Sequence, residues 1–163
     1  MLLLKWIVIV LIVLVLAAIA AGQAGLLTGK EPPDLGVRDG KLKPLSKTDN
    51  CVSSQAGLYP DHPQRRYAEI APLALRGDGP ATMAKLKAVV EAMPGAKVVK
   101  SEPDYLYAQF TTKLMKYVDD VEFWYDPAAQ VIQVRSASRL GKSDLGANRK
   151  RVEAVRAGLA AAP

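Results

Sequence analysis

The sequence predicts an α+β fold, in which an antiparallel sheet of three to four strands is flanked by two helices and preceded by an N-terminal transmembrane helix. Three patterns lead to this expectation. An almost unbroken apolar run fills residues 1–27, two later segments repeat apolar residues at helical spacing, and strand-like segments lie between those two. We therefore expect an anchor or uncleaved signal at 1–27, a linker at 28–47 and one α+β domain at 48–163.

The first of these parts is long enough to cross a bilayer. Residues 2–21 would form a helix of about 30 Å, which matches the hydrocarbon thickness of a membrane. Lys5 and Trp6 suit the interface at one end of such a helix. A cleaved signal peptide is the alternative, because residues 18–20 (Ala-Ile-Ala) offer a small-x-small cleavage site. The length of the apolar run favours a retained anchor.

The elements of the domain follow from periodicity and from proline and glycine positions. Residues 28–47 are rich in proline, glycine and charge, as expected of a linker, and prolines keep residues 48–79 irregular. A helix is predicted to begin at Pro80 and to end at residues 94–95 (Pro-Gly). Strands are predicted at 97–102, 105–112, 118–126 and 130–138, and a last helix at 146–161.

The turn at residues 127–128 predicts how the last two strands pair. A two-residue loop there would set Asp120 opposite Arg135 and Val121 opposite Val134. Opposite charges would then meet on one face of the sheet and apolar residues on the other, whereas a slip by one residue would mix the faces. We therefore expect Asp120 and Arg135 to form a structural charge pair.

Positive charge is concentrated near the C-terminus. The chain has a net charge of +6, and residues 135–156 alone contain seven basic and two acidic residues. Such a balance favours an acidic partner, which would be either an acidic protein or anionic lipid. The membrane segment argues against nucleic acid as that partner.

Three motifs resemble those of a known family, the domain of unknown function family 1499. They are NCVSSQ at 50–55, YVDDVEF at 117–123 and, most specifically, VRSASRLGKSDLGANRKRVEAVR at 134–156. The resemblance covers about residues 50–159 and implies a single domain with no known reaction. Because many relatives carry a signal, anchor or lipoprotein segment, it also implies a domain on the outer (periplasmic or lumenal) side. Counting basic residues beside the apolar segment would instead place the domain in the cytoplasm.

The last motif contains the candidate binding residues. An anion or an acidic partner would be bound by Arg139, Lys142, Asn148 and Arg149. Arginine binds phosphate and carboxylate through its two-pronged guanidinium, and glycine-lined turns before a helix expose N–H groups that suit anions. The competing interpretation is structural, with these arginines bracing loops through carbonyl oxygens and the acidic residues 119–122. Motif arginines often have that role, which favours the structural interpretation.

No set of catalytic or metal-binding residues is complete. A hydrolase-type enzyme would have to use Cys51 or Ser53 with His62, the single histidine, and this is the alternative from another function class. At most two of the carboxylates at 119–122 can converge, which is fewer than a hard cation needs, so we expect no metal and no cofactor. We expect a non-catalytic, membrane-tethered accessory or binding module, with a structural subunit of a membrane complex as the further alternative.

Overall fold

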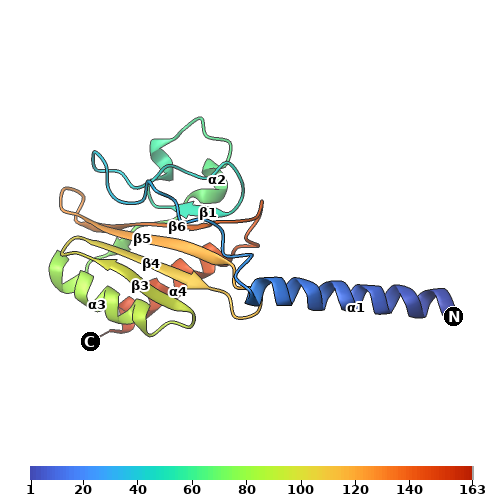
Figure 1. The fold of residues 1–163 in the computed structure, drawn as a ribbon. Coiled ribbons are helices and arrows are strands. Elements are labelled where there is room, and N and C mark those ends of the chain that lie inside the picture. Colours follow the sequence, from blue (N-terminus) through green and yellow to red (C-terminus); the bar gives the residue numbers. More distant parts are fainter. Residues whose placement is uncertain (163) are drawn as a thin grey trace.

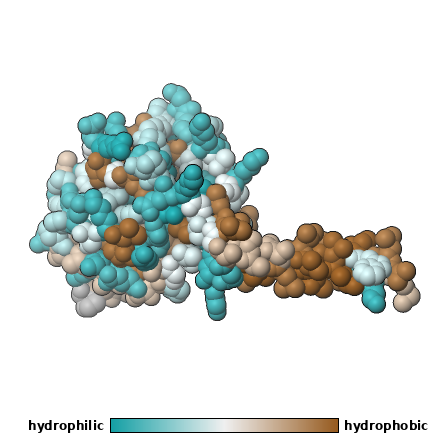
Figure 2. Space-filling model, viewed as in Figure 1, coloured by the Kyte–Doolittle hydropathy of each residue, from teal (hydrophilic) through white to brown (hydrophobic). Residues whose placement is uncertain are grey.

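The computed structural model describes residues 1–162 and shows a domain from which one long helix projects (Figure 1). This helix, α1 (Leu2–Gln23), exposes apolar side chains along its length (Figure 2). Among the described residues it is the one helix long and apolar enough to cross a membrane or to act as a signal sequence. The predicted N-terminal apolar helix is therefore confirmed.

Six antiparallel strands form one sheet in the order β1-β6-β5-β4-β3, and β2 also pairs with β6. They are β1 (Cys51–Ser53), β2 (Leu73–Ala74), β3 (Ala96–Ser101), β4 (Tyr105–Thr111), β5 (Val118–Asp126) and β6 (Val131–Ser138). The α+β class is confirmed, and each predicted strand lies within one residue of an observed one. The expected number of three to four strands is too low, because β1 and β2 are too short to show alternation.

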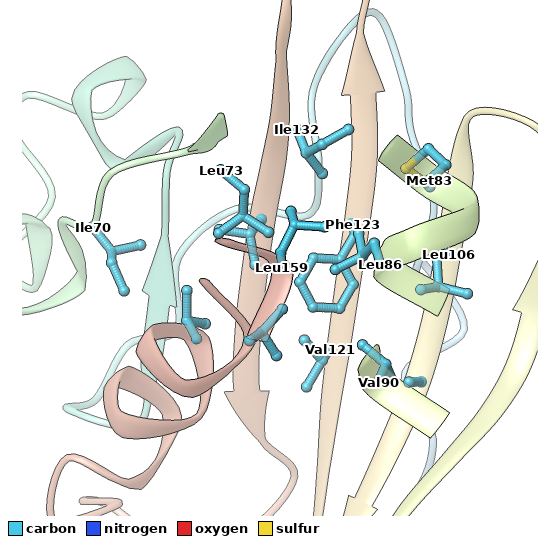
Figure 3. Close-up of a cluster of buried hydrophobic side chains, with 14 of the residues drawn as sticks. Ile70, Leu73, Met83, Leu86, Val90, Leu106, Val121, Phe123, Ile132 and Leu159 are labelled. Atoms are coloured by element: carbon cyan, nitrogen blue, oxygen red, sulfur yellow. The ribbon is translucent and has the colours of Figure 1, made fainter. Parts of the chain in front are cut away.

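Two helices cover one face of this sheet and enclose the hydrophobic core (Figure 3). They are α3 (Gly79–Glu91) and α4 (Ala147–Ala161). Leu86 from α3, Phe123 from β5 and Val155 from α4 are fully buried in that core. Two short helical turns, η1 (Ala56–Leu58) and α2 (Arg65–Ala68), lie in the segment that was expected to be irregular.

The pairing of β5 with β6 differs from the prediction by two residues. Glu122, and not Asp120, lies opposite Arg135, while Asp120 lies opposite Ala137. The predicted Asp120–Arg135 pair is therefore wrong. A shift by two residues keeps every side chain on its own face, so the predicted division into an apolar and a charged face is right.

The length of the turn explains this shift. The β5–β6 loop contains four residues, 127–130, instead of two. Its start is held by the Asp126 carboxylate, which accepts hydrogen bonds from the backbone N–H groups of Ala128 and Ala129 at 3.1 and 3.0 Å. Gln130 completes it in the left-handed conformation, with φ of 54°. Asparagine and aspartate stabilise turns in this way by binding the backbone just ahead of them.

Residues 28–47, which were expected to be a linker, pack against the sheet on the face opposite the helices. We call them the cover segment. Its Leu42 is 2% exposed and packs with Tyr105 and Tyr107 of β4. Leu45 is also buried, against Ala56 and Ala68. The sheet is thus covered on both faces, by helices on one and by the cover segment on the other.

Helix α1 is fixed to the domain at its C-terminal end. Gly22 lies so close to the β4–β5 loop that a Cβ atom there would be 2.5 Å from the carbonyl oxygen of Met115. The side chain of Gln23 donates a hydrogen bond to the carbonyl oxygen of Leu114 at 2.8 Å. These contacts determine which end of the sheet lies beside α1 (Figure 1).

Candidate functional site

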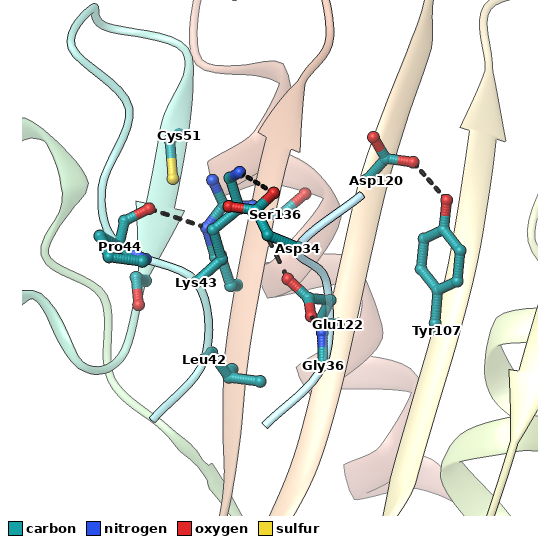
Figure 4. A network of polar contacts seen from close by, with 12 residues as sticks. Asp34, Gly36, Leu42, Lys43, Pro44, Cys51, Tyr107, Asp120, Glu122 and Ser136 are labelled. Atoms are coloured by element: carbon teal, nitrogen blue, oxygen red, sulfur yellow. Dashed lines mark hydrogen bonds and ion pairs between the residues drawn. The ribbon is translucent and has the colours of Figure 1, made fainter. Parts of the chain in front are cut away.

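Charged side chains are buried between the sheet and the cover segment (Figure 4). One oxygen of Glu122 accepts hydrogen bonds from the Gly36 N–H at 2.7 Å and the Tyr105 hydroxyl at 2.8 Å. The other oxygen has no hydrogen-bond partner within residues 1–162 and lies 3.7 Å from a nitrogen of Arg135. Burial raises the pKa of Glu122, because its hydrogen bonds and this long ion pair only partly offset the loss of water.

Arg139, a predicted binding residue, already holds a carboxylate of its own chain. Its Nε and Nη2 atoms donate to the two oxygens of Asp120 at 2.9 and 2.7 Å, and its side chain is 7% exposed. The Tyr107 hydroxyl also donates to Asp120, at 2.6 Å. Burial, together with this bond to a carboxylate, raises the pKa of Tyr107. Asp120 therefore forms its charge pair with Arg139, through two hydrogen bonds, and not with Arg135 as we expected.

Asn148, a second predicted binding residue, is completely buried at the start of α4. Its amide nitrogen donates to the Asn50 carbonyl oxygen at 3.1 Å, the Ser138 hydroxyl at 3.0 Å and the Asp144 carboxylate at 2.8 Å. Its oxygen accepts a hydrogen bond from the Ser136 hydroxyl at 2.5 Å. Through these contacts Asn148 joins the start of β1, the end of β6 and the first turn of α4.

Arg149, a third predicted binding residue, fastens α4 to the chain that precedes β2. Its Nη2 atom donates to the carbonyl oxygens of Tyr67 and Glu69 at 2.6 and 2.9 Å. Arg156, two turns later, donates in the same way to the carbonyl oxygens of residues 71–72 at 2.7 and 2.6 Å. Both arginines make the carbonyl contacts that the structural interpretation expects.

Lys142, the fourth predicted binding residue, has a different environment. It is exposed and forms no side-chain hydrogen bond or ion pair within the described part of the chain. Arg151, which sequence analysis did not single out, is committed internally instead. It binds Asp119 at 2.5 Å and lies over the ring of Phe110, 4.8 Å from its centre. The arginines of the basic segment thus hold the fold together, whereas Lys142 is not engaged within the described residues.

The residues of the hydrolase alternative make local contacts instead of binding one another. Cys51 is 1% exposed in β1, and the hydroxyl of buried Ser53 accepts a hydrogen bond from the Gln55 N–H. His62 accepts one from the Gln64 N–H, and within residues 1–162 no hydrogen bond joins His62 to Cys51 or Ser53. The same residues contain no group of three acidic, histidine or cysteine side chains that would hold a metal ion.

Three loops meet beside the root of α1, and we call them together the loop end. They are residues 24–28 after α1, the β4–β5 loop at 112–117 and the β6–α4 loop at 139–146. Five large apolar side chains are exposed there: Leu26 (74%), Leu114 (56%), Tyr117 (38%), Leu140 (41%) and Leu145 (89%). Figure 2 shows apolar surface continuing from the root of α1 onto the domain. Exposed apolar patches in proteins are often interaction sites with lipid or with another protein.

The loop end also carries unpaired positive charge. Lys113 and Lys142 are exposed in two of its loops and make no ion pair within the described residues. Two of its other residues, Lys116 and Leu145, adopt the left-handed conformation, with φ of 56° and 52°. Apolar side chains flanked by lysines are typical of a surface that rests on lipid headgroups.

Comparison with known proteins identifies the domain. A family model for proteins of unknown function, DUF1499, matches residues 41–159. The chain belongs to the DUF1499 family. The match begins inside the cover segment and includes all six strands as well as α3 and most of α4, whereas α1 lies outside it. No curated protein and no solved structure matches the chain.

The three motifs of this DUF1499 chain converge on the base of the β6–α4 loop. Asn50, from the first motif, donates to the carbonyl oxygen of Gly141 at 2.8 Å. Asp119, from the second motif, is bound by Arg151 of the third. The motifs therefore build the support of a loop whose outer residues, including Leu145, stay exposed.

Proposed function

We propose that this DUF1499 chain is a single-pass membrane protein whose domain is a non-catalytic binding module that rests on lipid through its loop end. The observation that carries this proposal is that α1 leaves the domain among the exposed leucines. A spanning helix places the residues at its end among the lipid headgroups. Because Gly22 and Gln23 are fixed to the β4–β5 loop, that loop is held at the same depth.

The energetics of the exposed leucines favour lipid over water. Removing a leucine side chain from water contributes about 1.5–3 kcal/mol. Leu145 combines 89% exposure with a left-handed backbone, a conformation that costs a residue other than glycine about 1–2 kcal/mol. In water this arrangement has no compensating gain. Insertion of the side chain among lipids offsets both costs.

Lys113 and Lys142 support an anionic lipid surface as the acidic partner. Each basic residue near such a surface contributes about 1 kcal/mol, and the attraction weakens as salt screens it. The arginines of the last motif are not needed for this contact, since Arg139, Arg149 and Arg151 are engaged inside the domain.

The junction between α1 and the domain supports an anchor that is retained. Residues 18–20, the small-x-small motif of the signal-peptide alternative, lie inside α1. Cleavage there would separate α1 from Gly22 and Gln23, so their contacts with the β4–β5 loop would have no helix to hold. In this proposal the domain lies on the outer side, as the family's frequent signal segments imply. Labelling of Ala128→Cys by a membrane-impermeant maleimide on intact cells tests the side.

Depth-dependent quenching tests the lipid contact on the full chain in lipid nanodiscs. A fluorophore at Leu114→Cys or Leu145→Cys should be quenched by lipids brominated near the headgroup. Ala128→Cys is the matched control, because the β5–β6 turn lies at the opposite end of the sheet and should not be quenched. Buried Cys51 should not react, and the parent chain checks this. Equal quenching at all three positions would refute the proposal.

A further inference from the structure

We infer that the loop end contains a binding site for one acyl chain of a bilayer lipid. A cavity of about 450 Å³ lies between its three loops, within the 300–1,000 Å³ range of ligand-binding pockets. This inference rests on the proposed function, since the lipid reaches the cavity only if the loop end faces the bilayer. It goes further, because it assigns a site inside the domain and a class of ligand.

The apolar part of the cavity wall comes from all three loops. It consists of Leu27, Tyr117, Leu140 and Leu145. Leu145, Leu140 and Tyr117 are also among the most exposed apolar residues of the domain, so the cavity opens on the surface beside α1. An acyl chain that leaves the lipid layer beside α1 therefore meets a continuous apolar path into the domain.

The acidic residues of the wall indicate that an uncharged group enters. Asp119 is neutralised by Arg151. Asp144 accepts hydrogen bonds from the Tyr67 hydroxyl and from the N–H groups of Gly146 and Asn148. Both carboxylates have their own donors, and Asp144, whose donors are neutral, would repel a phosphate or a free carboxylate. The hydrocarbon chain thus occupies the cavity, while an anionic headgroup stays outside, near the exposed lysines.

Photo-crosslinking tests this site in the full chain. Nanodiscs would contain a small fraction of phospholipid with a diazirine near the end of one acyl chain, and mass spectrometry would locate the label after illumination. We expect label on residues 24–28 and 138–147. Ala147→Trp, which places a large side chain in the cavity wall, should lower that label at least fivefold. Ala154→Trp is the matched control, because residue 154 is exposed on α4 and does not line the cavity.

Two further measurements complete the test. Ser143→Trp fills the cavity from a different, exposed position and should act like Ala147→Trp if that variant folds poorly. Quenching at Leu114→Cys in the Ala147→Trp chain should persist, because it reports the lipid contact alone.

Persistent quenching with undiminished label in both filled variants would overturn the acyl-chain site. If the Leu114→Cys chain without a cavity-filling substitution is not quenched either, the proposed function itself is overturned. Labelling by a diazirine fatty acid but not by the phospholipid would overturn the assignment to a bilayer lipid.

Discussion

Arg149 joins two parts of the domain that are far apart in the sequence. Its guanidinium reaches from α4 to two carbonyl oxygens of the segment before β2, at residues 67 and 69. A lysine has no planar fork with which to reach both oxygens, so arginine is better suited to this position. The contact holds the segment from which Ile70 and Leu73 enter the core.

Replacing this arginine should destabilise the domain. We expect Arg149→Ala to lower the free energy of unfolding by about 1–2 kcal/mol, because hydrogen bonds from a charged donor are lost and carbonyl groups are left unpaired. Thermal melting of the full chain in detergent, followed by circular dichroism, measures the loss. Lys150→Ala is the control, since Lys150 is exposed and its side chain forms no hydrogen bond or ion pair within residues 1–162. Superimposable melting curves for Arg149→Ala and the parent would contradict the structural role.

Because Glu122 is buried, we expect the stability of the domain to depend on pH. Burial raises the pKa of Glu122 above its ordinary value of 4.5. The contribution of such a carboxyl to stability is greatest below that value and is lost as pH rises through the folded-state pKa. The stability of the parent relative to Glu122→Gln should therefore increase as the pH falls from 7 to 4.5. Urea unfolding of both chains at several pH values measures this difference in stability. Asp144, whose pKa is lowered, acts in the opposite direction in both chains and cancels in the comparison.

Among the elements, those with clear periodicity were predictable and those held by distant partners were not. Strands β3 to β6 and both covering helices follow from local patterns. The two short strands depend instead on pairing with β6, and residue 52 meets residue 136 across more than half of the chain. The four-residue turn was missed because the Asp126 side chain, and not Pro127, determines where it begins.

The candidate site was predictable to a smaller extent. Position in the motif identified Arg139, Asn148 and Arg149, but the carbonyl partners of Arg149 lie about 80 residues away in the sequence. The leucines of the loop end were missed because single leucines in loops have no periodicity. One signal was present: in an antiparallel meander, the β4–β5 loop and the β6–α4 loop lie at the same end of the sheet. Leu114 and Leu140 belong to those two loops.

Replacing Leu145 in the β6–α4 loop should raise the stability of the domain and weaken its contact with lipid. Leu145→Gly removes the cost of a left-handed leucine, which the greater freedom of glycine in the unfolded chain partly offsets. We expect the free energy of unfolding to rise by up to about 1 kcal/mol, while photo-labelling of this loop by lipid decreases. Leu58→Gly is the control, because Leu58 is also an exposed leucine but its φ is not positive, and this change should lower stability. A fall in stability for Leu145→Gly would contradict the strain argument.

At the scale of the whole molecule, the long apolar helix α1 and the domain are built as one body. The covered sheet, the loop end and α1 are connected through the contacts of Gly22 and Gln23. The loop end is therefore held in a fixed orientation relative to α1, which a flexible tether would not provide.

Breaking the junction should uncouple the domain from the bilayer. Gly22→Val places side-chain atoms where the Met115 backbone lies, so the helix end must move away from the β4–β5 loop. We expect quenching at Leu145→Cys by brominated lipid to fall at least twofold, with little change in the melting of the domain. Ala18→Val is the control, since residue 18 is exposed on the same helix. Unchanged quenching in Gly22→Val would show that the loop end holds the bilayer without help from the junction.

The pairing of β1 with β6 also means that β1 is synthesised well before its partner strand. The ribosome makes residues 51–53 well before residues 135–137, with which they pair. At about 5–20 residues per second, the delay is on the order of ten seconds, during which α1 is available to enter a membrane. Through that interval Val52 and Leu73, which are fully enclosed in the finished domain, have no partner strand. The nascent chain therefore keeps these two strands unpaired until β6 emerges.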